Sequence, residues 1–254
     1  MLFRSLTARW DGLAETGYFS LAYDIGLRVV AAVGTALDVL LFQIAVRAGE
    51  THGAETARQQ VATNMAVVFA ILAPTCAGVW LTLPSLEHIV VPADFRGHFE
   101  RYFTLTLGGL FAFGMINYAI NPIFQIDKRT GPIIAAALVA CVADALLIAL
   151  LPKNGAGLAL ALSGALLAGL CALMLIAAGS KARWPRARDI LLALVGAAAM
   201  TTCVAPLRAW SPGVVTLVAQ VVAGVAVYGA FVGAFDIAGL RTAFLDFLRG
   251  RARA

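Results

Sequence analysis

Two long apolar runs follow one another, TGPIIAAALVACVADALLIALLP (130–152) and GLALALSGALLAGLCALMLIAAG (157–179), and a polar segment, PKNGAG (152–157), joins them. Each run exceeds the roughly 20 apolar residues that are needed to span the hydrocarbon core of a bilayer. The pattern therefore predicts a hairpin of two membrane-spanning helices. It also excludes most classes of soluble enzyme.

The rest of the chain has the same character. Apolar residues make up 61% of the sequence and charged residues 13%, and the mean hydropathy is +0.87. Strands of a membrane barrel would alternate apolar and polar residues, and these stretches do not. We therefore predict an all-α, polytopic transmembrane bundle of about seven spans. The apolar stretches lie near residues 22–46, 63–83, 102–122, 131–151, 157–178, 190–210 and 213–238.

Several functional classes lack their sequence signals. No phosphate-binding glycine motif, no serine-hydrolase motif and no paired carboxylates are present, so no catalytic residue and no cofactor is predicted. The three histidines lie in loops, and no metal site is predicted. The net charge of +5 is read as a signal of membrane topology, because the cations lie in loops, and nucleic acid is not an expected partner.

The distribution of Lys and Arg among the loops predicts the orientation in the membrane. With seven spans, one side holds Arg4, Arg9, Arg96, Arg101, Lys153 and Arg208. The other side holds more: Arg47, Arg58, Lys128, Arg129, Lys181, Arg183, Arg186, Arg188, Arg241, Arg249, Arg251 and Arg253. Because cytoplasmic loops are the richer in Lys and Arg, we expect the C-terminus in the cytoplasm and the N-terminus outside.

The first span carries a charged stripe. At 100° per residue, Arg28 lies 40° to one side of Asp24, and Asp38 lies 40° to the other side. One interpretation is that Asp24 and Arg28 neutralise each other near the outer interface while Arg28 extends toward water. The alternative is that the stripe lines a water-filled cavity and Arg28 meets an anionic group of a substrate.

Polar side chains also interrupt the third and fourth spans. Asn117, Asn121 and Gln125 follow one another by single turns, and Pro122 should bend or end their helix. These amides either bond to a neighbouring helix or line the same cavity. Asp144, in the middle of the fourth span, either packs inside the bundle or serves a coupling cation.

The remaining segments complete the predicted organisation. Gly229 and Gly233 form a GxxxG pair, which favours helix packing. The predicted parts are an outer N-terminal segment (1–21), a five-span bundle (22–178), a basic cytoplasmic loop (179–189), two additional spans (190–238) and an amphipathic, basic cytoplasmic tail (239–254).

The order of these features resembles a known family of transporters. GYFSLAYDIG enters the first span, IVVPADFRGHFERYF precedes the third, and DKRTG and VADALLIALLPKNGAGLALAL follow. Over about residues 16–178 this order is similar to the polysaccharide flippases of the multidrug/oligosaccharidyl-lipid/polysaccharide exporter superfamily. Asp144 departs from the pattern, because the family usually has Asn there. The residues that carry the resemblance are Gly17, Tyr18, Ala22, Tyr23, Arg129, Thr130, Pro152, Gly155 and Gly157.

The resemblance implies a fold and a function. The chain would correspond to the C-terminal lobe of a two-lobe transporter, as a truncated or split chain whose missing N-terminal lobe or second copy completes the cavity. It would export a polyprenyl-diphosphate-linked oligosaccharide across a bacterial inner membrane by alternating access and would not be an enzyme. Arg28 would bind the diphosphate, Asp24 would orient Arg28, and Asn117, Asn121 and Gln125 would meet sugars, with Asp38 in the same cavity.

Two other functions stay open from the sequence. One is a non-transporting membrane scaffold or gene remnant, which would bind no substrate. The other is a cation-coupled drug exporter of the same superfamily, for which Asp24, Asp38 and Asp144 would supply the acidic groups.

Overall fold

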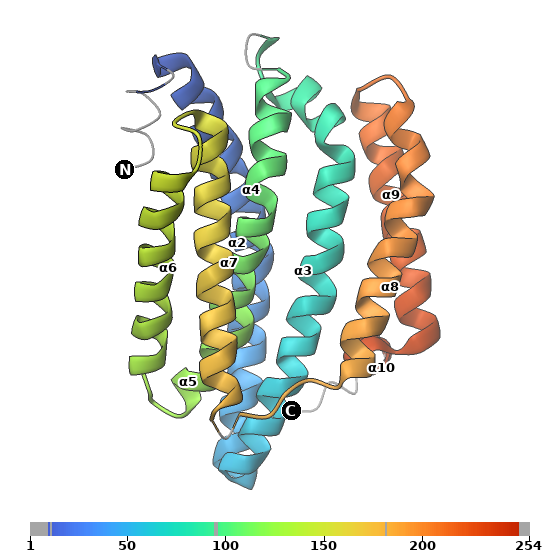
Figure 1. Ribbon diagram of the computed structural model, residues 1–254. Helices are drawn as coiled ribbons and strands as arrows, with labels where there is room; N and C mark the ends of the chain where they lie inside the picture. The colour runs from blue at the N-terminus through green and yellow to red at the C-terminus, as the bar shows by residue number, and fades with distance from the viewer. Residues whose placement is uncertain (1–9, 11, 94–95, 181, 249–254) are drawn as a thin grey trace.

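The computed structural model describes residue 10 and residues 12–93, 96–180 and 182–248, and its elements are all helices (Figure 1). Seven of them are long and apolar enough to cross a membrane, which confirms the predicted all-α bundle of about seven spans. The elements are α2 (Gly12–His52), α3 (Ala54–Val90), α4 (His98–Gly114), η2 (Met115–Ile120), α5 (Asn121–Ile126), α6 (Gly131–Leu150), α7 (Gly155–Ala178), α8 (Ala187–Val204), η3 (Ala205–Ala209), α9 (Val214–Phe235), η4 (Ile237–Gly239) and α10 (Leu240–Leu248).

The first two helices are longer than the apolar stretches that predicted them. α2 has 41 residues and α3 has 37, so each is roughly 55–60 Å long at 1.5 Å per residue. Their connected ends extend below the rest of the bundle as drawn in Figure 1. α2 begins at Gly12, so part of the predicted N-terminal segment is helical, whereas residues 1–9 and 11 lie outside the described residues.

α3 lies between two groups of helices. It packs against α2 and α4 on one side and against α8 and α9 on the other, while α6 packs mainly against α7 at the edge of the molecule (Figure 1). Two cores hold the larger group together. One contains Leu72, Leu110, Phe124 and Leu173, and the other contains Leu83, Phe99 and Phe103, all of them buried.

The turn between α6 and α7 is as tight as its sequence predicts. The Asn154 side chain accepts a hydrogen bond of 2.8 Å from the Gly157 amide, which caps the first turn of α7. A Cβ atom on Gly157 would lie 2.0 Å from the Pro152 carbonyl oxygen. Glycine is therefore required there by the close approach of the backbone.

Pro122 neither ends nor breaks the third span. The chain widens into the π-helical segment η2 and resumes as α5, with Pro122 in the first turn of α5. A proline is tolerated in a first turn, because its missing N–H would have no intrahelical partner there. The wide turn therefore lets the third span continue from His98 to Ile126.

The GxxxG interpretation of α9 is wrong for the packing that the structure describes. A Cβ atom on Gly229 or on Gly233 would meet no atom within 4 Å. The close helix contact forms elsewhere: Gly109 of α4 faces Ser163 of α7, where an added Cβ would lie 2.7 Å from the Ser163 Cα atom.

Candidate functional site

The charged residues of α2 lie along one side of the helix. The opposite side of α2 is buried against α3 and α4 through Ala22, Gly26, Val30 and Gly34. Arg28 and Thr35 are exposed, and Asp24 and Asp38 are half-buried. We call these four residues the α2 polar stripe, and they face away from the core of the bundle.

Arg28 is the cation of this stripe. Its guanidinium forms no ion pair or hydrogen bond with any residue that the structure describes, including Asp24. The neutralising Asp24–Arg28 pair considered from the sequence is therefore not among the described contacts. An unpaired charge within an apolar span is costly against lipid, so it needs water, a ligand or a second protein surface.

Tyr118 completes the other end of the stripe. Its ring lies across Gly34, where an added Cβ would approach ring atoms to 2.1 Å. Asp38, Tyr118 and Asn64 line one small cavity of about 10 Å³. The Asn64 amide nitrogen donates to the Leu41 carbonyl at 2.7 Å, which ties α3 to α2 there. The stripe spacing alone did not indicate Tyr118, because its position depends on how α4 and η2 pack on α2.

The other predicted polar residues are not gathered at the stripe. Asn117 is half-buried and donates to the Phe113 carbonyl of its own helix at 2.8 Å, and Gln125 is exposed near the end of α5. Asn121 is buried, and its side-chain oxygen has no partner among the described residues. Asp144 is half-buried on α6, which packs mainly against α7. The amide triplet is therefore spread over three environments.

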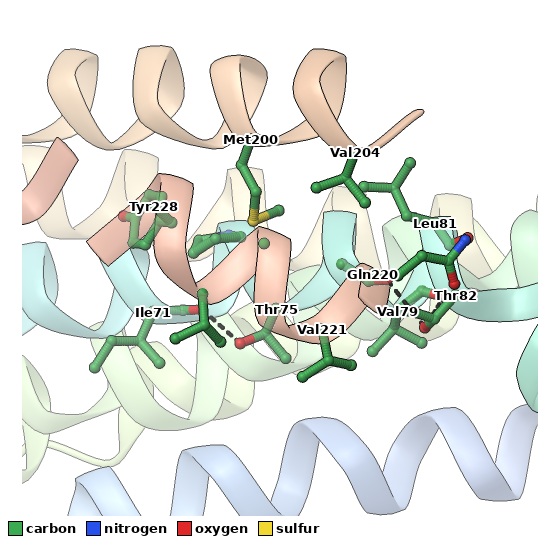
Figure 2. A pocket seen from close by; sticks show the side chains of 14 residues that line it. Ile71, Thr75, Val79, Leu81, Thr82, Met200, Val204, Gln220, Val221 and Tyr228 are labelled. Carbon is green, nitrogen blue, oxygen red and sulfur yellow. Dashed lines mark hydrogen bonds between the residues drawn. The ribbon is translucent and has the colours of Figure 1, made fainter. Parts of the chain in front are cut away.

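An apolar cavity lies between α3, α8 and α9 (Figure 2). Its volume is about 390 Å³, and its lining includes Val79, Met200 and Val221. Such a volume is in the range of small-ligand sites, which are commonly about 300–1,000 Å³. No pattern in the sequence indicates this cavity.

The polar groups that line the cavity mostly bond to backbone. Thr75 donates to the Ile71 carbonyl at 2.7 Å, and Tyr228 donates to the Ala70 carbonyl at 2.5 Å. The exception is Gln220, which is 2% exposed: its nitrogen donates to the Leu81 carbonyl at 3.4 Å, and its oxygen has no described partner. The cavity therefore suits an apolar molecule.

The cavity is separated from α2 by α3. Thr75 and Val79 line the apolar cavity, and they also line a small crevice with Gly26 and Val29 of α2. Val29 belongs to the side of α2 that packs on α3 and α4, whereas Arg28 is exposed on another side of the helix. The apolar cavity and the α2 polar stripe are therefore separate features of the lobe, with α3 between the cavity and α2.

Comparison with known proteins finds a solved structure with a similar fold. No family model matches the chain, and no curated protein matches it. Among solved structures it is similar to the lipid II flippase MurJ in an inward closed conformation, with a TM-score of 0.71 and 15% sequence identity. The likeness covers 92% of this chain and 51% of that one, so the chain spans about half the length of the flippase. At this identity the likeness shows the fold alone: the seven helices form a bundle of the kind found in that transporter.

Proposed function

We propose that this chain is one lobe of a transporter that moves a polyprenyl-diphosphate-linked oligosaccharide across a bacterial inner membrane by alternating access. The observation that carries the proposal is Arg28, an arginine without a described partner on the exposed side of a membrane-length helix. The shared fold with a flippase of lipid II supports the same substrate class.

Each part of such a substrate would contact a different group of residues. The diphosphate would meet Arg28, since a guanidinium forms two parallel hydrogen bonds with phosphate oxygens. An apolar part of the prenyl chain would enter the apolar cavity that Val79 and Met200 line. Sugars would meet the polar groups farther along α2, at Thr35 and Asp38, and Tyr118 of η2.

Some of the expected roles change with the geometry. Asp24 makes no described contact with Arg28, so it would act as a second polar group of the stripe and would not orient the arginine. Asn117 and Gln125 stay candidate sugar contacts, because both are at least partly exposed. Asn121 is buried and is better suited to a role inside the lobe. A coupling ion at Asp144 would sit apart from the stripe.

A second lobe would cover the α2 polar stripe and close the substrate cavity there. The exposed α2 polar stripe needs a facing surface, and the chain spans about half of the flippase with the same fold. We propose that this surface comes from a separate lobe or from a second copy of the chain. The N-terminus would lie outside and the C-terminus in the cytoplasm, because the loops with more Lys and Arg gather at one end.

The proposal is tested by transport of a fluorescent lipid-linked oligosaccharide in proteoliposomes that contain this chain and its facing lobe. Arg28→Ala should abolish transport, whereas Arg28→Lys should retain part of it, because a lysine keeps the charge without the bidentate geometry. Arg47→Ala is the matched control, since Arg47 is exposed on the same helix near its far end. Both alanine variants should fold normally.

Two results would contradict the proposal. Transport by well-folded Arg28→Ala at the rate of the unchanged protein would remove Arg28 from the site. A chain that binds no lipid-linked oligosaccharide with any partner lobe would favour the membrane scaffold.

A further inference from the structure

A polar pocket lies at the end of the molecule opposite the α6–α7 turn. Its volume is about 530 Å³, and it is bounded by the first half of α3, the segment before α8, the end of α9 and the start of α10. Lys181, in the basic loop predicted from the sequence, is outside the described residues, but the rest of that loop contributes to the pocket. Its polar and aromatic lining includes Gln59, Thr63, Trp184, Arg186, Arg188 and Arg241.

Two of the three arginines have free side chains. Arg241 donates to the Gly233 carbonyl at 3.1 Å and lies 4.0 Å from the Asp236 carboxylate. Arg186 and Arg188 are exposed, and within the described part of the chain their side chains form no ion pair or hydrogen bond. The acids of the pocket, Asp189 and Asp236, leave it with an excess of positive charge.

The start of α8 adds to this positive potential. The helix begins at Ala187, and its N-cap residue Arg186 provides no side-chain hydrogen bond to the first turn. The N–H groups of a first turn lack intrahelical partners and favour an anion. The Asp189 N–H donates to the Arg186 carbonyl at 3.0 Å, whereas the N–H groups of Ala187 and Arg188 have no partner among the described residues and lie next to the two free arginines.

The pocket lies at the polar ends of the apolar helices α8 and α9. Exposed apolar side chains begin one turn further along α8 with Leu191, which is 60% exposed, and Phe235 at the end of α9 is 43% exposed. Trp184, also part-exposed, is of the type that collects at the boundary between membrane and water. An anion held here would lie where the phosphates of the bilayer lie.

We propose that this pocket binds the phosphate group of one anionic phospholipid from the surrounding bilayer. Arg186 and Arg188 hold the phosphate, the first turn of α8 donates to it, and the acyl chains run along the exposed apolar side chains of α8 and α9. Basic pockets between membrane helices are suited to anionic headgroups. This pocket is separate from the proposed substrate site, because no residue of the α2 polar stripe lines it.

The test measures lipid binding to the full chain in neutral detergent by native mass spectrometry, with phosphatidylglycerol, phosphatidylcholine and inorganic phosphate as separate probes. We expect one tightly bound phosphatidylglycerol per chain and no comparable binding of phosphatidylcholine. The double variant Arg186→Gln/Arg188→Gln should weaken this binding by about tenfold or more, as expected when charge-assisted hydrogen bonds are lost. Arg186→Lys/Arg188→Lys should weaken it less.

The matched control is Arg47→Gln/Arg129→Gln, which removes the same charge from exposed arginines outside the pocket. Unchanged phosphatidylglycerol binding in this control supports the pocket, and an equal loss in both double variants would show diffuse surface attraction instead. Phosphatidylcholine binding as tight as that of phosphatidylglycerol would overturn the role of charge. Displacement of the lipid by inorganic phosphate at matched ionic strength would identify a free-phosphate site and would also overturn the proposal.

Discussion

Asp236 holds the end of α9 to the start of α10. One of its carboxylate oxygens accepts a hydrogen bond from the Thr242 amide at 3.2 Å, and the other accepts one from the Thr242 hydroxyl at 2.6 Å. The Thr242 hydroxyl bond is the main cause that lowers the pKa of Asp236, and the positive charge of Arg241 acts in the same direction. The carboxylate therefore stabilises this turn only while it is ionised.

The lowered pKa predicts a pH dependence. A depressed carboxyl pKa stabilises the folded turn above the unfolded value near 3.9, and this contribution is lost as the pH falls through the folded value. A nitroxide at Ala243→Cys should become more mobile only as the pH falls below about 4. Asp236→Asn should remove this change, because asparagine tolerates the left-handed backbone at φ 48° without carrying a charge. An identical mobility profile in both proteins would contradict the role of Asp236.

Individual site residues were only partly predictable from the sequence. The common side of Asp24, Arg28 and Asp38 follows from helical periodicity alone, and these residues do lie along one side of α2. Tyr118 and Gln220 gain their positions from contacts between helices that are far apart in the chain. Periodicity within one helix carries no signal for such contacts.

At the scale of elements, Gly109 permits the close approach of α4 to α7. Gly109 lies against the Ser163 backbone, and the Ser163 hydroxyl donates to the Leu105 carbonyl at 2.7 Å. Gly109→Ala should therefore separate the helices and destabilise the bundle by about 1–3 kcal/mol, as overpacking does. The measurement is the unfolding midpoint in detergent under increasing denaturant.

The adjacent glycine provides the control. Gly108 is exposed, and a Cβ atom there would meet Leu167 only at 3.9 Å. Gly108→Ala should be neutral or slightly stabilising, because alanine is the better helix former. If both variants lower the midpoint equally, the contact with Ser163 is not the cause, because helix propensity alone would raise the midpoint in both.

The elements were more predictable than their ends and contacts. Hydropathy identifies the part of a helix that lies in lipid, so it located all seven spans and missed the polar extensions of α2 and α3. The open GxxxG pair of α9 shows the same limit, because small residues permit a close contact without specifying a partner.

At the scale of the whole molecule, the two kinds of exposed surface should differ in their access to water. α6 has exposed apolar side chains along its length, such as Val142 at 60% exposure, as expected for a helix that faces lipid. The α2 polar stripe is also exposed, but it contains an arginine and two aspartates. Within an apolar span, such a stripe needs water, a ligand or a second protein surface.

Labelling of single cysteines in membranes distinguishes the water-accessible surface from the lipid-facing surface. In a background without the native cysteines, Thr35→Cys should react with a membrane-impermeant maleimide from at least one side of the membrane, because Thr35 lies exposed between Arg28 and Asp38. Val142→Cys should stay unreacted, since thiols in lipid do not ionise to the reactive thiolate. Saturation with a lipid-linked oligosaccharide should slow the reaction at Thr35→Cys. A protected Thr35→Cys that is never labelled would mean that a second protein surface covers the stripe permanently, and alternating access through this face would then be excluded.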